Sequence, residues 1–89
     1  MSPAELQNLR VAVAQQLRSA GGYALPVEAL SRGARLVGFP TITEAEIRAE
    51  LVYLADKQLV AVDQKIVSPE LKRWRLTAAG RDWLAEEGL

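Results

Sequence analysis

Residues 43–60, with the sequence TEAEIRAELVYLADKQLV, carry the strongest structural signal in the chain. The segment opens with a capping box over Thr43 to Glu46, in which the first side chain accepts from the helix and the fourth reaches back. Its apolar positions Ile47, Leu51 and Leu54 then recur at spacings of four and three, which places them on one face of a helix. The pattern predicts a helix over about 44–58, followed directly by a β-branched run.

Two more helices are predicted upstream of this segment. The capping sequence Ser2 to Glu5, with Pro at its second position, starts a helix over about 3–20, and Gly21-Gly22 ends it. After a brief strand at Tyr23–Leu25, Pro26 starts a second helix that runs to about residue 37. Gly33 within it is expected to permit close packing against a neighbouring helix, and residues 38–42 form a tight helix–turn–helix connection. Four apolar residues share one face of this second helix: Val27, Leu30, Ala34 and Val37.

The downstream third of the chain predicts a β-hairpin and a last helix. Leu59 to Val67 is rich in β-branched residues and is typical of a strand, Ser68 to Glu70 is typical of a turn, and Leu71 to Leu76 alternates as a second strand. Thr77 caps a helix over about 78–87, which Gly88 ends. The whole order of elements predicts an α+β fold in a single domain over residues 1–89.

This order resembles the winged helix-turn-helix superfamily, of the kind seen in MarR-, PadR- and ArsR-like transcription factors. Two stretches carry the resemblance, Ile47-x3-Leu51-x2-Leu54-x4-Leu59-Val60 and Arg75-Leu76-Thr77-Ala78-Ala79-Gly80-Arg81. The resemblance implies a three-helix core, a β-hairpin wing, a C-terminal helix, double-stranded DNA as the partner and a role in regulating transcription. The chain also resembles, more distantly, small winged-helix proteins of Mu-like bacteriophages. The family pattern usually has Gly where this chain has Gln58, which is then expected to take a left-handed conformation at some strain.

The composition limits the classes of function. The 89 residues carry eleven basic and eleven acidic side chains, a net charge of zero, whereas nucleic-acid binders usually have an excess of Lys and Arg. The absence of Cys and His removes thiolate metal ligands, the commonest metal ligand and the commonest general base. No stretch reaches the roughly 20 apolar residues that span a bilayer, and no signal peptide is visible. We therefore expect a cytoplasmic protein that is not an enzyme, with no cofactor, metal, small-molecule substrate or membrane partner.

The third helix is acidic. Residues 43–58 contain four acidic and two basic side chains, a net charge of −2. Carboxylates set against DNA lower the affinity, so a solvated acidic face is the simpler interpretation, and the spacing of Glu46 and Glu50 predicts that both are exposed. The resemblance places five residues on the outer side of this helix, where the major groove would lie: Thr43, Glu44, Arg48, Ala49 and Tyr53.

The predicted hairpin is basic. Residues 65–75 contain four basic side chains and one acid, Glu70, a net charge of +3. Arg73 and Arg75 project to the same side of their strand, and such a wing can hold phosphates or enter a minor groove. The alternative is that these charges protect an exposed hairpin edge from aggregation. With two arginines of the second helix as backbone contacts, the candidate DNA-binding residues are Arg32, Arg35, Thr43, Arg48, Lys65, Lys72, Arg73 and Arg75.

The large apolar side chains leave a second function open. Trp74 and Trp83 are expected in the core, with base stacking on Trp74 as the alternative. Val52 and Tyr53 are expected at the side or outside of the third helix, where an exposed apolar patch would mark a partner surface. The competing hypothesis is therefore a protein-interaction module that does not bind DNA, either an adaptor or a homodimer formed through the first or the last helix.

Overall fold

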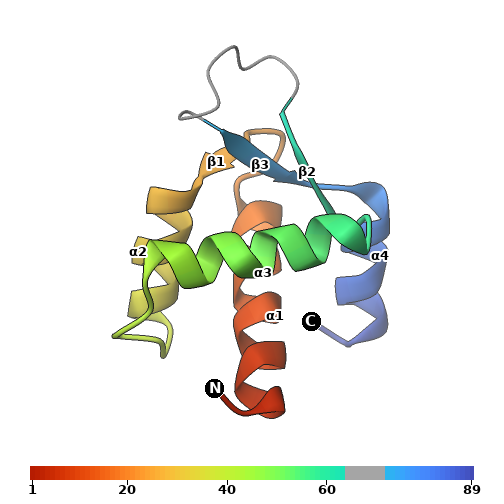
Figure 1. The fold of residues 1–89 in the computed structure, drawn as a ribbon. Coiled ribbons are helices and arrows are strands. Elements are labelled where there is room, and N and C mark those ends of the chain that lie inside the picture. The colour runs from red at the N-terminus through yellow and green to blue at the C-terminus, as the bar shows by residue number, and fades with distance from the viewer. Residues whose placement is uncertain (64–71) are drawn as a thin grey trace.

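The computed structural model describes residues 1–63 and 72–89, and this part of the chain forms an α+β fold (Figure 1). Four helices and a small antiparallel sheet of three strands make up the described part, and the last element is a helix. In Figure 1, α2 and α4 lie on either side of α1, α3 crosses in front of it, and the sheet lies at the end of α1 away from the N-terminus. The elements in chain order are α1 (Pro3–Ser19), β1 (Leu25–Pro26), α2 (Val27–Leu36), α3 (Glu44–Asp56), β2 (Val60–Val62), β3 (Arg73–Leu76) and α4 (Ala78–Glu86).

The start of α1 follows the capping prediction. The Ser2 side chain accepts from the backbone N–H of Glu5, and the Glu5 carboxylate accepts from the backbone N–H of Ser2. These hydrogen bonds hold the pKa of Glu5 below its ordinary value of 4.5, because they favour the charged carboxylate. α1 ends at Ser19, one residue before the predicted end, and Gly21 takes a φ of +66°.

α2 ends earlier than the sequence predicts. The backbone N–H groups of Val37 and Phe39 both donate to the Ala34 carbonyl, at 3.2 and 3.0 Å, which closes the helix at Leu36. Val37 therefore leaves the helical path and is 60% exposed, so the prediction that it shares the buried face of α2 is wrong. The connection to α3 covers residues 37–43 and is longer than the predicted 38–42.

α3 begins with the predicted capping box and ends at Asp56. The Thr43 hydroxyl accepts from the backbone N–H of Glu46, and the Glu46 carboxylate accepts from the backbone N–H of Thr43. At the other end Gln58 has a φ of +64°, the left-handed conformation expected where the family pattern has Gly. The chain turns there into β2, so the helix stops two residues short of the predicted end.

The sheet has the order β1-β3-β2, with both edge strands antiparallel to β3. The brief strand predicted at Tyr23–Leu25 lies instead at Leu25–Pro26, where Leu25 pairs with Trp74. On the other edge Val62 pairs with Trp74 and Val60 with Leu76. Within the described residues β2 is Val60–Val62 and β3 begins at Arg73, two residues after the predicted start. The predicted turn at 68–70, and Lys65 with it, lie outside the described residues.

The core gathers the helical faces predicted from the spacing. Ile47, Leu51 and Leu54 of α3 are 0 to 1% exposed, and Trp74 is buried among them while Trp83 packs from the edge. Two glycines allow close approach to a neighbouring segment. A Cβ atom on Gly33 would overlap the Gln16 side chain of α1, as the close-packing prediction requires, and one on Gly80 would overlap the Leu59 carbonyl. The core consists of Leu9, Val13, Ala14, Leu17, Leu30, Ala34, Ile42, Ile47, Leu51, Leu54, Val60, Trp74, Leu76 and Leu84.

Among the described residues, no helix combines the length and the apolar character needed to cross a bilayer.

Candidate nucleic-acid interface

The strand β3 presents its two arginines on one face. Arg73 and Arg75 are exposed, whereas Trp74 and Leu76 between and after them are buried. This alternation follows from the twofold period of a strand, because the apolar residues face the core and the arginines must then face away from it. Lys72 precedes β3 and is also exposed. We call Lys72, Arg73 and Arg75 the basic strand surface.

The neighbouring strands leave the basic strand surface open beside Arg75. Ala61 of β2 lies opposite Arg75, and Pro26 of β1 lies opposite Arg73. Both are short side chains without charge. The backbone N–H of Asp63 donates to the Arg73 carbonyl at 2.9 Å, so this acid is aligned with Arg73 at the edge of the sheet. The surface therefore combines three cations with one neighbouring carboxylate.

Ion pairs in the described part of the chain involve other arginines. Arg10 pairs with Glu50, Arg32 with Glu28, and Arg48 with Glu44. Within residues 1–63 and 72–89, no carboxylate lies within 4.0 Å of the basic groups of Lys72, Arg73 or Arg75. These three cations are held by the fold near one another, and among the described residues their charge is not neutralised by a bonded partner.

The outer side of α3 is less acidic than its composition indicates. The prediction that Glu50 is exposed is wrong: Glu50 is only 7% exposed, and its Oε1 accepts from Arg10 Nη2 of α1 at 3.2 Å. The spacing of Glu46 and Glu50 did not determine exposure, because Glu50 follows Ile47 and adjoins Leu51 on the core side. Glu46 is exposed, but its carboxylate accepts from the backbone and the hydroxyl of Thr43.

A second contact ties Arg10 to α3. The Arg10 guanidinium lies over the Tyr53 ring, with 3.8 Å between its carbon and the ring centroid, and the Lys57 ammonium is 5.7 Å from the same centroid. Tyr53 was predicted at the side or outside of α3 and is 39% exposed. Arg10 Nε is buried and has no hydrogen-bond partner among the described residues. We call Arg10, Glu50 and Tyr53 the Arg10 cluster.

No local pattern in the sequence predicts the Arg10 cluster. Forty positions separate Arg10 from Glu50, and no local spacing rule reaches across that distance. The cluster depends on the tertiary contact between α1 and α3.

The remaining candidate residues of α2 and α3 differ in whether their side chains already have hydrogen-bond or ion-pair partners. Thr43 caps α3, so its hydroxyl is already engaged. Arg48 is more than half exposed and lies 4.0 Å from Glu44, one turn earlier. Arg35 donates from Nε to the Ile42 carbonyl at 3.1 Å, which fixes the connection between α2 and α3. Arg32 is exposed and lies 3.9 Å from Glu28.

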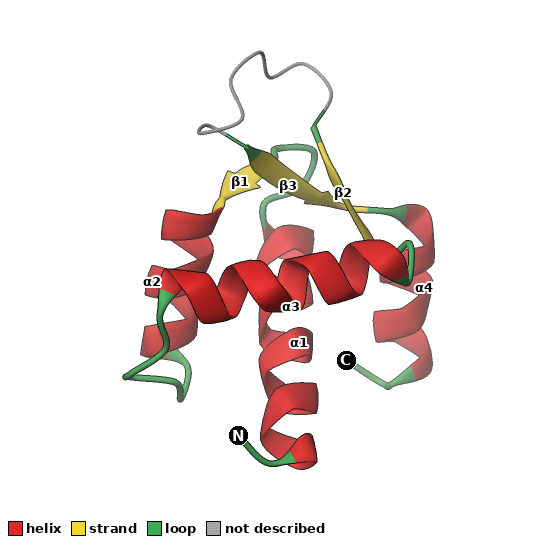
Figure 2. Ribbon diagram, viewed as in Figure 1, coloured by secondary structure: helices red, strands yellow, loops and turns green. Residues whose placement is uncertain are grey.

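These candidates come from three elements rather than one. Figure 2 shows the sheet at one end of the molecule, α3 running below it, and α2 at one side of α3. The structure thus groups Lys72, Arg73 and Arg75 with one another on the sheet, and places Arg48 on α3 and Arg32 on α2. Lys65 lies outside the described residues.

One side of α3 that is exposed carries small apolar side chains. Ala45 and Ala49 are exposed, and Val52 is 52% exposed. They follow one another at spacings of four and three, so they lie on one side of the helix. Among the described residues, no group of three or more acidic side chains has the geometry to hold a metal ion.

No model of a protein family matches the chain, and no curated protein matches it.

Proposed function

We propose that this protein is a winged helix-turn-helix domain that binds double-stranded DNA, as a regulator of transcription or of bacteriophage development. In this proposal α3 lies at the major groove, and the basic strand surface holds phosphates beside it. The observation that carries the proposal is the exposure of Arg73 and Arg75 on one side of β3, with the exposed Lys72 just before the strand, without a bonded carboxylate among the described residues.

The order of elements supports the winged-helix assignment. α2 and α3 follow one another through the connection at 37–43, the antiparallel strands β2 and β3 come next, and α4 closes the described chain. β1 adds a third strand to the pair, beside β3. In this assignment β2 and β3 form the stem of the wing.

The orientation of Glu50 removes part of the objection to DNA binding. A carboxylate that is paired with Arg10 and turned to the core does not face a phosphate. The outer side of α3 then offers Ala45, Ala49 and Val52, whose methyl groups are suited to contact the methyl of thymine, and Arg48, which is suited to guanine. Arg48 must leave an exposed pair with Glu44 to do so, and such a pair is weak.

A salt titration tests the proposal directly. We would measure the fluorescence anisotropy of a labelled mixed-sequence duplex with the wild-type protein at about 50 mM and about 200 mM salt. Three phosphate contacts predict that the affinity falls about 40-fold between the two conditions, because each contact releases a condensed counterion. No binding at the lower salt would contradict the proposal.

Single substitutions locate the contact. Arg73→Ala and Arg75→Ala should each weaken binding to every duplex and reduce the slope of log affinity against log salt by about 0.9. Arg81→Ala, which removes the same charge from the exposed surface of α4, is the matched control and should leave both quantities unchanged. Equal effects of all three substitutions would show a response to net charge and not a contact at β3.

A protein-interaction module is the second candidate, favoured by the exposed Val52 and Tyr53 of α3. If α3 docks on a protein, DNA binding is absent at about 50 mM salt and Val52→Asp leaves that result unchanged. The same titration therefore separates the two candidates.

A further inference from the structure

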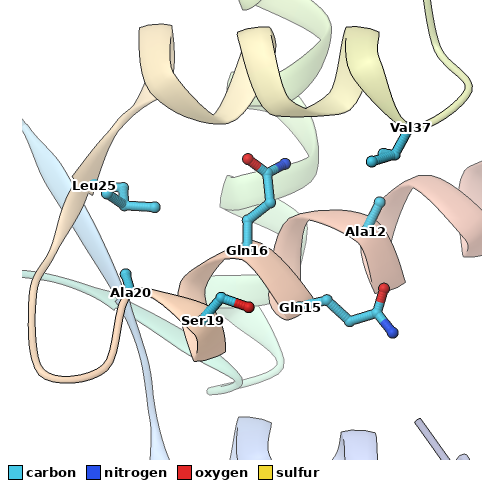
Figure 3. A pocket seen from close by; sticks show the side chains of 7 residues that line it. All are labelled: Ala12, Gln15, Gln16, Ser19, Ala20, Leu25 and Val37. Atoms are coloured by element: carbon cyan, nitrogen blue, oxygen red, sulfur yellow. The ribbon is translucent and has the colours of Figure 1, made fainter.

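A groove runs along the outer side of the junction between α1 and α2. Two adjoining hollows form it, of about 480 and 450 Å³, and they share Ala12, Gln15 and Val37. Figure 3 shows the first of these hollows, with Leu25 at one end and Val37 at the other, above Ala12 and Gln15 of α1. The second continues past Val37 to Phe39. We call the two together the α1–α2 groove.

The lining of the α1–α2 groove is almost free of charge. Its side chains are small, apolar or amides and hydroxyls, and the single charged residue among them is Glu5, at the end near Phe39. A chain with 25% charged residues thus has a groove in which Glu5 is the one charged lining residue. The occupant that fits this groove is an apolar side chain, accompanied by a cation at the Glu5 end.

An exposed apolar side chain directly precedes the lining residue Val37 in the chain. Leu36 at the end of α2 is 86% exposed and adjoins Val37, which is 60% exposed. Arg32 lies one turn earlier on α2, and residues four apart lie on the same side of a helix. Arg32 is exposed, and its pair with Glu28 at 3.9 Å is exposed too, so it can be exchanged for another partner at little cost.

The direction of the two helices makes this surface self-complementary. Gln16 of α1 donates from Nε2 to the Leu30 carbonyl at the start of α2, whereas Ala12 shares the groove with Val37 at the end of α2. The two helices are therefore antiparallel. A twofold axis perpendicular to the groove reverses α2 in a second copy, so that the second α2 runs from the Glu5 end of the groove toward Gln15.

We propose that the α1–α2 groove is the interface of a symmetric dimer of this chain. Leu36 of each copy enters the groove of the other near Ala12, and Arg32 of each copy reaches Glu5 of the other. The spacing fits, because about 10 Å of helix separates Glu5 from Ala12 and about 6 Å separates Arg32 from Leu36, and the arginine side chain spans the difference. The basic strand surface and the outer side of α3 are not part of this interface.

Sedimentation equilibrium over about 5 to 500 μM protein tests the dimer, a range chosen because a micromolar dissociation constant is typical of a modest interface. The wild type should change from monomer to dimer within this range. Leu36→Asp should raise the dimer dissociation constant at least about 100-fold, because two buried leucines are lost per dimer. Val52→Asp places the same charge at another exposed apolar position, on α3, and should leave the dissociation constant unchanged.

A charge exchange tests the orientation of the two copies. Arg32→Glu should raise the dissociation constant about tenfold by setting two acids together, and the added change Glu5→Lys should restore it. Circular dichroism checks that both variants keep the helical content of the wild type.

Three results would overturn the dimer proposal. They are a wild type that remains monomeric at the highest concentration, a dimer unaffected by Leu36→Asp, and a dimer broken equally by Val52→Asp. The proposal does not rest on DNA binding, since sedimentation is measured without DNA.

Discussion

The α1–α3 interface and the outer face of β3 both carry arginine, but the fold treats the two positions in opposite ways. Arg10 is mostly buried, with 18% of its side chain exposed, and both Glu50 and the Tyr53 ring hold its guanidinium. Arg73 and Arg75 are exposed, and no carboxylate of the described residues pairs with them. In the first region arginine joins two helices through a buried ion pair, and in the second its charge is exposed on the surface of the strand.

The difference shows why a count of charges misleads for this protein. The net charge of zero includes both Glu50 and Arg10 at full weight, and the net −2 of residues 43–58 includes Glu50 without its partner Arg10. These two charges largely cancel each other at short range, where no ligand meets them. What a ligand would meet is decided by the direction of each side chain, so the basic strand surface counts for more than the total.

The largest loss of stability is expected from a substitution at Arg10. We expect Arg10→Ala to lower the free energy of unfolding by about 2–3 kcal/mol, because it leaves the Glu50 carboxylate buried without a partner. Urea denaturation followed by circular dichroism measures the loss. The double variant Arg10→Leu with Glu50→Leu should recover most of it, because an apolar pair of similar size replaces a buried ion pair well. A loss below about 0.5 kcal/mol, the size of an ordinary surface effect, would show that the pair is not a structural tie.

The ring contact in the Arg10 cluster gives the next effect. Tyr53→Leu keeps an apolar side chain but removes the aromatic face beneath the guanidinium, and we expect it to destabilise the fold by about 1 kcal/mol. Val52→Ala on the neighbouring exposed position should change the stability by less than about 0.5 kcal/mol. Thermal unfolding of both variants separates the two, and equal melting temperatures would argue against the cation–π contact.

The junction between the two regions offers a stabilising change. Gln58 connects α3 to β2 with a φ of +64°, and Gly takes this conformation without the strain of a side chain. Gln58→Gly should raise the free energy of unfolding by about 0.5 kcal/mol, the strain relieved less the added freedom of the unfolded chain. Lys57→Gly, at a φ of −84°, should instead lower it. A loss of stability from Gln58→Gly would mean that the left-handed residue carries little strain.

The smallest effect is expected on the basic strand surface. Arg73→Ala combined with Arg75→Ala should change the free energy of unfolding by less than about 0.5 kcal/mol, because both side chains are exposed and have no ion-pair partner among the described residues, and such side chains contribute little. Differential scanning calorimetry of this variant and of Arg10→Ala compares the two losses of stability directly. A loss of unfolding free energy as large as that of Arg10→Ala would show that the β3 arginines stabilise the sheet and are not simply available to a ligand.

Local rules were sufficient for most of the elements. The capping boxes at Ser2–Glu5 and Thr43–Glu46, the apolar row of α3 and the left-handed Gln58 each depend on residues within one or two helical turns. Their physical causes therefore lie within a short segment. The end of α2 was harder to predict, because backbone hydrogen bonds to Ala34 closed the helix before Val37.

The sequence by itself determined the order of the elements, the buried row of α3 and the alternation that turns Arg73 and Arg75 away from the core. The tertiary structure alone decided that β1 pairs with β3, that Glu50 meets Arg10, and that Ala12 and Val37 line one groove. Each of these contacts joins segments that lie far apart in the chain. Residue spacing encodes which side of an element faces the core, but the partner on that side depends on how the elements pack.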